Sequence, residues 1–467
     1  MPWIRMLFNS LPFLYFFLPI TYLVFWRLPG RTSRYVWLTM TGYVFYGFWN
    51  YQFCPLLAFS TLMSYWAGRG LLAWTDPRRR KLCLVLPITI DLLILGFFKY
   101  VNFGLESVGQ LVQWVGLSFA PEPLAILLPI GISFYTFHNI SYLVDSYRGV
   151  IVPTRNFWEY ASYVSLFSQL VAGPIVRFRE IKQDLDQLDR VDRFRYFQKA
   201  CSFFAIGMIE KVLIADSIAS FIDPALANYA ELSTLDVWLC MLGYTYQLYF
   251  DFCGYSDMAV GLGYLFGLHI PRNFNSPYQA ATIQDFWRRW HISLFSCLRD
   301  YVYIPLGGNR VASWLVARNV LLTMLIGGIW HGANWTFIYW GLYHGLLLVG
   351  FQLGEDYWAR LPGLLQRGAT FLMVVVGWTI FRSDNLDMAG TLLQRMWVYK
   401  FELPAVQEPV LVGLLLLVGA WAHLGPNTFE MRHEWGRVPA GLLALFFVGC
   451  LLTLVQHRPS PFLYFQF

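Results

Sequence analysis

The chain has 467 residues, of which 57% are hydrophobic and only 13% are charged, and its mean hydropathy is positive. This balance excludes an ordinary soluble domain and predicts a polytopic membrane protein. The net charge of +6 is modest and gives no indication of nucleic-acid binding.

Apolar stretches recur from residues 11–26 to residues 442–455. Many are shorter than the ~20 apolar residues that cross about 30 Å of hydrocarbon. Some should therefore be re-entrant or interfacial helices, whose ends are tolerated only where protein or water covers them. We expect an all-α integral membrane fold with residues 1–467 in a single domain, because neither a linker nor an internal repeat divides the chain. The first apolar stretch lacks a small-residue cleavage site and is interpreted as a retained anchor.

Basic loops set the expected orientation. Arginines follow the first apolar stretch, and a second basic cluster at residues 78–81 follows the third. The positive-inside rule places both loops in the cytoplasm and the N-terminus outside.

The most polar long segment is residues 174–200. Its apolar side chains recur every three or four residues, which predicts an amphipathic helix: Ile181, Leu185, Leu188, Val191 and Phe194. Such a helix either lies in the cytoplasmic membrane interface or packs on its own protein.

Residues 244–263, YTYQLYFDFCGYSDMAVGLG, hold the first candidate site. On a helix, Gln247, Asp251 and Tyr255 form one polar stripe. A carboxylate at membrane depth is costly unless it is paired or hydrated, so it is a functional candidate by default. Equally, Asp251 or Asp257 could pair with a nearby arginine and only lock the packing.

Residues 286–309, FWRRWHISLFSCLRDYVYIPLGGN, hold the second candidate site. Thr282 with Asp285 predicts an N-cap just before it. On the helix that follows, Trp287 and His291 should lie one turn apart on one face. Arg288 and Arg289 should leave the helix on another side. The arginines suit the phosphates of a cytosolic molecule or, alternatively, lipid head groups.

Residues 323–345, TMLIGGIWHGANWTFIYWGLYHG, hold the third. Gly327, Gly328 and Gly332 flank His331 and allow close backbone approach. The apolar and aromatic surroundings predict a neutral imidazole, which can accept a proton from an attacking hydroxyl, as acyl transfer to an alcohol requires. A lone membrane histidine ordinarily makes a structural hydrogen bond, but a second histidine, His291, favours catalysis.

Several other chemistries lack their signatures. The seven cysteines show no CxxC spacing, and neither HxxxH nor HExxH occurs, so no metal site is predicted. The GxSxG elbow is absent, Ser296 stands where an HxxxxD motif needs aspartate, and Cys297 has no evident base one turn away. The remaining histidines are expected to be structural or exposed: His138, His269, His344, His423, His433 and His457.

These three stretches, in this order, resemble the membrane-bound O-acyltransferase family, and within it the branch that acetylates alginate or transfers D-alanine to teichoic acid. The segments LLPIGISFYTFHNISYLVDSYRG and LVAGPIVRF extend the resemblance over most of the chain. It implies a helical membrane fold with a central channel. It also implies that His331 matches the near-invariant histidine of the family and that His291 matches its second catalytic-region position. The supporting residues would be Gln247, Asp251, Tyr255, Trp287, Arg288, Arg289 and Asn334.

The resemblance further implies an enzyme of the bacterial inner membrane without a bound cofactor. Acetyl-CoA would donate the acetyl group from the cytoplasm. The partners would be membrane lipid, a periplasmic or membrane-anchored acetyltransferase and a polysaccharide synthase machinery. The polar segment before the last apolar stretch is short here, at residues 427–438, whereas alginate-type proteins carry a longer polar insertion at this place. Cellulose is therefore expected beside alginate as an acceptor. The alternatives are D-alanyl or other acyl transfer to an envelope polymer, and non-enzymatic transport of an acylated or lipid-linked carrier.

Overall fold

The computed structural model describes residues 6–117, 121–171, 173–398, 409–456 and 462–463, and every regular element within them is a helix. The chain divides into two compact units. Unit 1 comprises Met1–Leu7, Pro12–Tyr196 and Gly263–Ile270, and unit 2 comprises Phe8–Leu11, Phe197–Leu262 and Pro271–Phe467. The all-α class is thus confirmed, whereas the single domain stays a prediction.

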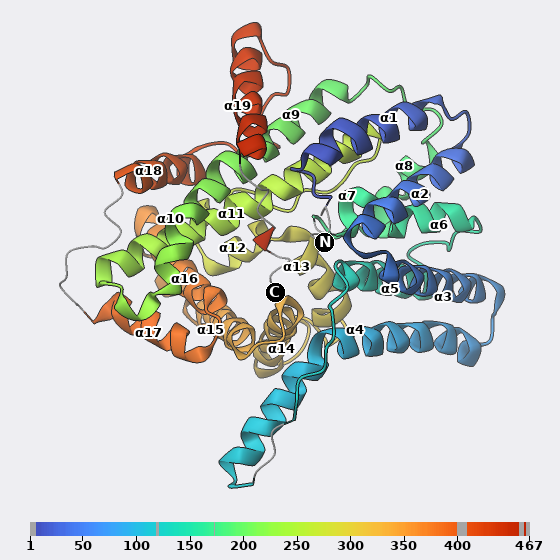
Figure 1. Ribbon diagram of the computed structural model, residues 1–467. Coiled ribbons are helices and arrows are strands. Elements are labelled where there is room, and N and C mark those ends of the chain that lie inside the picture. Colours follow the sequence, from blue (N-terminus) through green and yellow to red (C-terminus); the bar gives the residue numbers. More distant parts are fainter. Residues whose placement is uncertain (1–5, 118–120, 172, 399–408, 457–461, 464–467) are drawn as a thin grey trace. The chain divides into compact units, whose positions relative to one another are not determined.

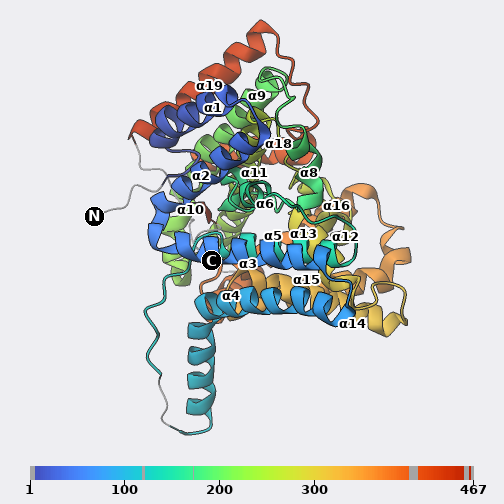
Figure 2. The same ribbon diagram turned by 90° about the vertical axis from the view of Figure 1, so that its right-hand side faces the viewer.

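Unit 1 holds the first helices of the chain (Figure 1): η1 (Phe13–Phe17), α1 (Leu18–Arg27), α2 (Arg31–Asn50), η2 (Tyr51–Phe53), α3 (Cys54–Ala73), α4 (Pro77–Trp114), α5 (Ile132–Tyr147), α6 (Phe157–Val164), α7 (Phe167–Leu170) and α8 (Phe178–Asp186). Helix α4 has 38 residues and is far longer than its apolar stretch at 83–98. Figures 1 and 2 show that it bends sharply, so that its last part projects as an arm from the rest of unit 1.

Helix α8 covers only part of the amphipathic helix predicted at 174–200. That prediction is wrong at residues 174–177 and 187–196, which are not helical, and residues 197–200 begin α9. Side chains of α2 take the carbonyls at its C-terminal end. The hydroxyl of Tyr35 donates to the carbonyl of Leu185 at 2.7 Å, and Arg34 donates to the carbonyl of Leu188. The apolar face of α8 is buried within unit 1, which favours the alternative of a helix packed on its own protein.

Unit 2 holds the remaining helices: α9 (Phe197–Met208), η3 (Ile209–Ala215), α10 (Asp216–Ala227), η4 (Tyr229–Glu231), α11 (Thr234–Leu265), η5 (Pro277–Gln279), α12 (Ile283–Arg289), α13 (Ile292–Leu298), η6 (Arg299–Tyr303), α14 (Ser313–His331), α15 (Trp335–Trp358), α16 (Gly363–Arg382), α17 (Leu386–Trp397), α18 (Pro409–Leu424) and α19 (Arg437–Gln456). Residues 263–265 at the end of α11 belong to unit 1. The labels η1, η3 and η6 denote π-helices, and the other η labels denote 3₁₀-helices.

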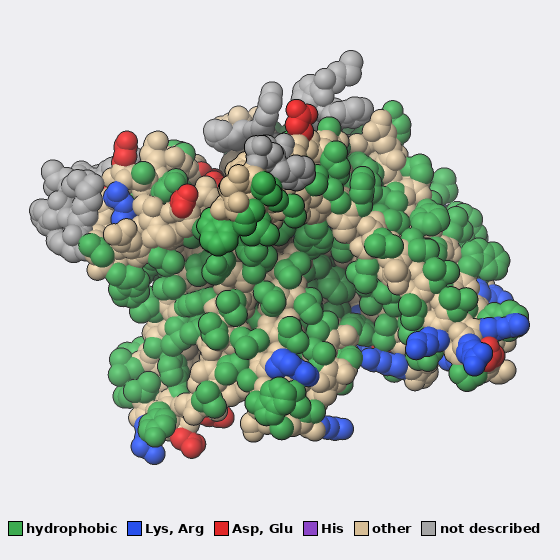
Figure 3. All heavy atoms as spheres, turned by 90° about the horizontal axis from the view of Figure 1, so that it is seen from below, with side chains coloured by type: hydrophobic (Ala, Val, Ile, Leu, Met, Phe, Trp, Pro, Cys, Tyr) green, Lys and Arg blue, Asp and Glu red, His purple; other side chains and the backbone are tan. Residues whose placement is uncertain are grey.

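Four helices in the described residues are long and apolar enough to cross a membrane by length and composition, namely α4, α14, α16 and α19. Figure 3 shows many hydrophobic side chains on the surface and few charged ones. The predicted multi-pass membrane protein is therefore confirmed. Helices α6, α7, α12 and α13 have eight residues or fewer and are too short to span, as expected for a chain with many short apolar stretches.

Helices α14 and α15 are consecutive and pack through close backbone contacts. A Cβ on Gly328 would lie 2.3 Å from the carbonyl oxygen of Phe337, and one on Gly341 would lie 2.5 Å from that of Met324. The predicted close approach next to His331 is thus confirmed at Gly328.

We expect Gly328→Ala to lower the free energy of unfolding by about 1–3 kcal/mol, because the added methyl group must push α14 and α15 apart. Thermal unfolding of the detergent-solubilised chain measures this effect. The matched control is Gly350→Ala in α15, where a Cβ would meet nothing within 4 Å. That change should be neutral or stabilising by up to ~1 kcal/mol. Equal effects at both positions would contradict the importance of the close contact.

Candidate active site

His291 lies at a break between α12 and α13. The hydroxyl of Thr282 accepts a hydrogen bond from the backbone N–H of Asp285 at 3.0 Å, which confirms the predicted N-cap. The prediction of one continuous helix, with Trp287 and His291 one turn apart, is wrong. His291 adopts a left-handed backbone conformation, with φ 44° and ψ 52°, and the helix axis changes there.

A neighbouring segment of unit 2 accounts for this break. The backbone N–H of Asn275 donates to the carbonyl of Arg289 at 3.0 Å, and the N–H of Ile292 donates to the carbonyl of Asn273 at 2.9 Å. A continuous helix would use both the Arg289 carbonyl and the Ile292 N–H internally. Because residues 273–275 take these groups, α12 ends and the chain turns at His291.

The hydrogen bonds of His291 define its tautomer. Its Nδ1 lies 2.9 Å from Oδ1 of Asn273, and the same oxygen accepts from the hydroxyl and the backbone N–H of Ser293 at 2.8 and 3.3 Å. Since this oxygen is an acceptor, Nδ1 must carry the ring proton, and the lone pair lies on Nε2. His291 is outside the membrane-spanning helices, and burial lowers its pKa to about 3. The ring is therefore neutral and has the form of a general base or hydrogen-bond acceptor.

His331 is the last residue of α14 and is only 5% exposed. Its ring stands nearly perpendicular to those of Trp340 and Phe381, with centroid distances of 5.0 and 5.3 Å. A Cβ on the next residue, Gly332, would lie 2.1 Å from the ring of Phe337. The predicted setting of small and aromatic residues around His331 is confirmed.

Trp330 connects the two histidines. Its ring centroid lies 6.0 Å from that of His291 and 5.1 Å from that of His331. The structure thus brings both predicted catalytic histidines against one indole, inside a buried aromatic layer. Sequence analysis did not single out Trp330, although its place directly before His331 was a usable signal.

The polar stripe predicted on residues 244–263 is present on α11, and Gln247, Asp251 and Tyr255 are all buried. The ring of Tyr255 stacks between those of Phe8 and Phe462, at centroid distances of 4.6 and 4.8 Å. These contacts hold the stripe in the interior of unit 2.

Asp251 forms a buried ion pair. Its Oδ1 lies 2.6 Å from Nζ of Lys211, which lies equally close to Asp216. The backbone N–H of Leu463 donates to the other oxygen of Asp251 at 3.0 Å. This arrangement favours the expected packing lock, with a lysine rather than an arginine as the partner. Sequence analysis missed Lys211, whose signal was a charged dipeptide inside the apolar run 203–215.

The residues predicted around α12 take different positions. The ring of Trp287 is buried, 4.9 Å from that of His344. Arg288 is exposed, whereas Nε of Arg289 donates to the carboxylate of Asp285 at 2.9 Å. Of the two arginines, Arg288 is thus the more accessible to a ligand.

Asn334 holds the start of α15 just beyond His331. Its Oδ1 accepts from the backbone N–H of Thr336 at 3.1 Å, and its Nδ2 donates to the carbonyl of Asp384 at 2.7 Å. Asn334 therefore fixes the turn that follows His331, which is a positioning role.

The other histidines have the surroundings of structural residues. His138 and His344 are fully buried. His423 and His433 each have a ring nitrogen bonded to a backbone carbonyl. His269 is bonded to the carboxylate of Asp184. His457 lies outside the described residues.

Comparison with known proteins places this arrangement in a family. The model of the membrane-bound O-acyltransferase family matches residues 150–381. The chain is 41% identical to a probable alginate O-acetylase, AlgI, of Pseudomonas putida, over 99% of this chain and 100% of that protein. It is 43% identical to a protein of the same name in Pseudomonas aeruginosa, over 92% and 83% of the two chains. A peptidoglycan O-acetyltransferase of Helicobacter pylori is 37% identical, over 84% and 80%. The chain thus belongs to the membrane-bound O-acyltransferase family and is a membrane O-acyltransferase.

Proposed function

We propose that this O-acyltransferase is an inner-membrane enzyme that moves an acetyl group from cytoplasmic acetyl-CoA to a hydroxyl of a secreted bacterial polysaccharide. The observation that carries the proposal is the pair of buried histidines against Trp330, one of them a neutral imidazole with its lone pair on Nε2. The similarity to proteins named alginate O-acetylase and peptidoglycan O-acetyltransferase supports acetyl as the acyl group.

The reaction needs a proton acceptor and a held thioester. An acceptor hydroxyl attacks the acetyl carbonyl carbon, a C–O bond forms, the C–S bond breaks and the thiol leaves with the proton that the hydroxyl gave up. His331 accepts or orients the hydroxyl proton. His291, whose ring also contacts Trp330, helps to hold the thioester. Asn334 positions His331, while exposed Arg288 suits the phosphates of the donor.

The acceptor follows from the same chemistry. Alginate and peptidoglycan, the polymers in the names of the relatives, are both built from sugars and offer hydroxyl groups. We therefore propose a polysaccharide such as alginate or cellulose as the final acceptor, reached directly or through a periplasmic or membrane-anchored acetyltransferase partner and the synthase machinery.

A sidedness experiment tests this proposal. Membranes containing the chain are prepared as inside-out and right-side-out vesicles, and acetyl-CoA labelled in the acetyl group is added outside. Because acetyl-CoA does not cross the bilayer, CoA release and label transfer should occur only in inside-out vesicles, which expose the cytoplasmic face. Vesicles without the chain are the control.

Two results would overturn the proposal. Turnover only in right-side-out vesicles would place the donor site on the other face. Transfer from a D-alanyl carrier protein, with none from acetyl-CoA in either vesicle type, would replace acetylation by D-alanyl transfer.

A further inference from the structure

Two helical segments of unit 2 approach each other unusually closely. A Cβ on Gly207, in α9, would lie 2.4 Å from the carbonyl oxygen of Gly254, and a Cβ on Gly254, in α11, would lie 2.6 Å from that of Gly207. About two turns further along α11, a Cβ on Gly261 would lie 2.8 Å from the carbonyl oxygen of Ala200. The absence of side chains at these glycines lets the two backbones touch.

This contact brings three potential metal ligands together. Glu210 lies in the π-helix η3 that continues α9, and Cys253 and Asp257 lie one turn apart on α11. One ligand atom from each of the three side chains lies within 4.8 Å of the other two. All three are buried, with exposures of 3%, 5% and 3% in the order named.

The two carboxylates are incompletely satisfied. Within the part of the chain that the structure describes, Oε2 of Glu210 and Oδ2 of Asp257 have no hydrogen-bond partner. Lys211 follows Glu210 directly, yet its amine is held at 2.6 Å by both Asp216 and Asp251. Buried carboxylates of this kind require a bound cation or a proton.

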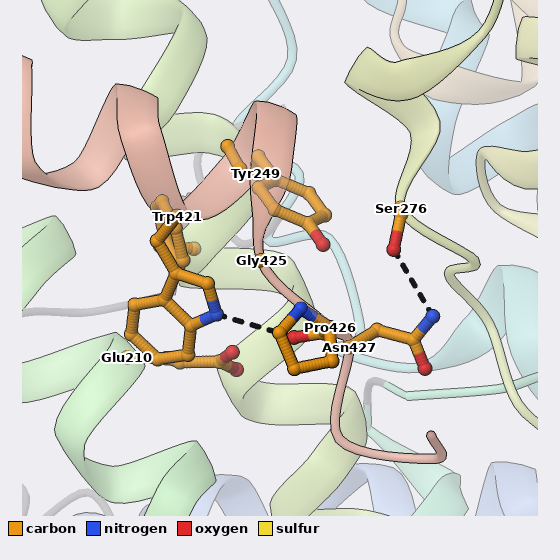
Figure 4. A pocket seen from close by; sticks show the side chains of 9 residues that line it. Glu210, Tyr249, Ser276, Trp421, Gly425, Pro426 and Asn427 are labelled. Atoms are coloured by element: carbon orange, nitrogen blue, oxygen red, sulfur yellow. Dashed lines mark hydrogen bonds between the residues drawn. The ribbon is translucent and has the colours of Figure 1, made fainter. Parts of the chain in front are cut away.

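Glu210 also lines a small pocket. Figure 4 shows its carboxylate beside Trp421 and Pro426. The pocket, of about 10 Å³, has room for about one water molecule. The side-chain amide of Asn427 donates to the hydroxyl of Ser276 at 3.0 Å at the pocket wall. A buried carboxylate with one oxygen that lacks a hydrogen-bond partner thus lines a space that can hold one small ligand.

We propose that Glu210, Cys253 and Asp257 form a site for a divalent transition metal ion, of which zinc is the best fit. A thiolate with two carboxylates is a donor set that zinc accepts, and three protein ligands leave a fourth position for a water molecule in the adjoining pocket. The dication offsets two of the three negative charges of this donor set and joins η3 to α11. The CxxC and HExxH patterns could not reveal this site, because its ligands come from two helices.

The site adjoins the segment that orients His291. Asn427, at the pocket wall, donates at 3.1 Å to Asn275, which lies two residues beyond the Asn273 that holds the imidazole. The metal ion would therefore stabilise, through Asn427 and residues 273–275, the segment that orients His291, without itself contacting His291, Trp330 or His331. This inference goes beyond the proposed acetyl transfer and does not depend on it.

The experiment measures metal content and thiolate ligation directly. The full chain is purified in detergent through an affinity tag that binds no metal, dialysed against zinc and analysed by elemental mass spectrometry. Cobalt then replaces zinc, and the thiolate-to-cobalt charge-transfer band reports a cysteine ligand. The variants are Cys253→Ser, Glu210→Gln and Asp257→Asn, with Cys240→Ser as the matched control, since Cys240 is another buried cysteine on α11.

Stoichiometric zinc is expected in the wild type and in Cys240→Ser, together with the cobalt–thiolate band. Each ligand variant should bind zinc more than ~10-fold more weakly, because even residues behind the ligands cost about 10–100-fold when changed. Cys253→Ser should also lose the cobalt–thiolate band. A wild-type chain that binds no zinc, or ligand variants that bind it as tightly as the wild type, would overturn the site, and the carboxyl groups would then share a proton instead. Because metal content is read without acetyl transfer, failure of the proposed function leaves this test intact.

Discussion

Replacing His331 by alanine is expected to lower kcat for acetyl transfer by about 10²–10⁴-fold, the usual contribution of a positioned general acid or base. The KM for the acyl donor should change little, because the imidazole contributes mainly to the transition state. His331→Gln should lose activity to a similar degree, since glutamine keeps volume and hydrogen bonding but cannot accept a proton. Release of CoA and transfer of labelled acetyl groups, both per amount of folded chain, measure the effect.

The control for His331 is His269→Ala. His269 is bonded to Asp184 in unit 1 and belongs to no part of the proposed site. The His269→Ala variant should keep the wild-type kcat. If the folded His331→Gln variant also keeps wild-type kcat, His331 has no chemical role and another residue must accept the proton.

Lys211→Met is expected to destabilise the chain by about 3–5 kcal/mol, because it leaves the buried carboxylate of Asp251 without its cation. Lys211 and Asp251 are each only 2% exposed at the side chain. The double variant Lys211→Met with Asp251→Asn should be more stable than the single variant, since the uncompensated charge is gone. Thermal unfolding in detergent measures both.

Arg299→Met is the matched control for the ion pair. Arg299 lies 2.7 Å from Asp300, but its side chain is 60% exposed. Water screens such a pair, so its loss should cost at most about 1 kcal/mol. A double variant no more stable than Lys211→Met alone would show that the charge of Asp251 is not what destabilises the single variant.

Local patterns predicted much of this molecule. The polar stripe of α11 and the cap at Thr282 depend on residues within a few positions of each other, and both are present. The glycines around His331 were equally readable, because small residues beside a buried side chain indicate close packing.

Long-range contacts explain what sequence patterns missed. The break at His291 depends on Asn273, whose backbone and side chain bond to residues 18 to 20 positions away. Helix α8 ends where side chains of α2 take its carbonyls, some 150 residues apart in sequence. The lysine that pairs with Asp251 lies on η3, and periodicity along α11 contains no information about it.

The left-handed backbone of His291 affects how any mutational study of this residue is interpreted. A non-glycine residue at φ 44° is strained unless its surroundings compensate, and asparagine tolerates this region better than alanine does. An alanine scan would therefore confound two losses at this position, the imidazole and the turn geometry. Asparagine keeps the turn and removes only the ring, so a comparison of the two variants separates chemistry from backbone conformation.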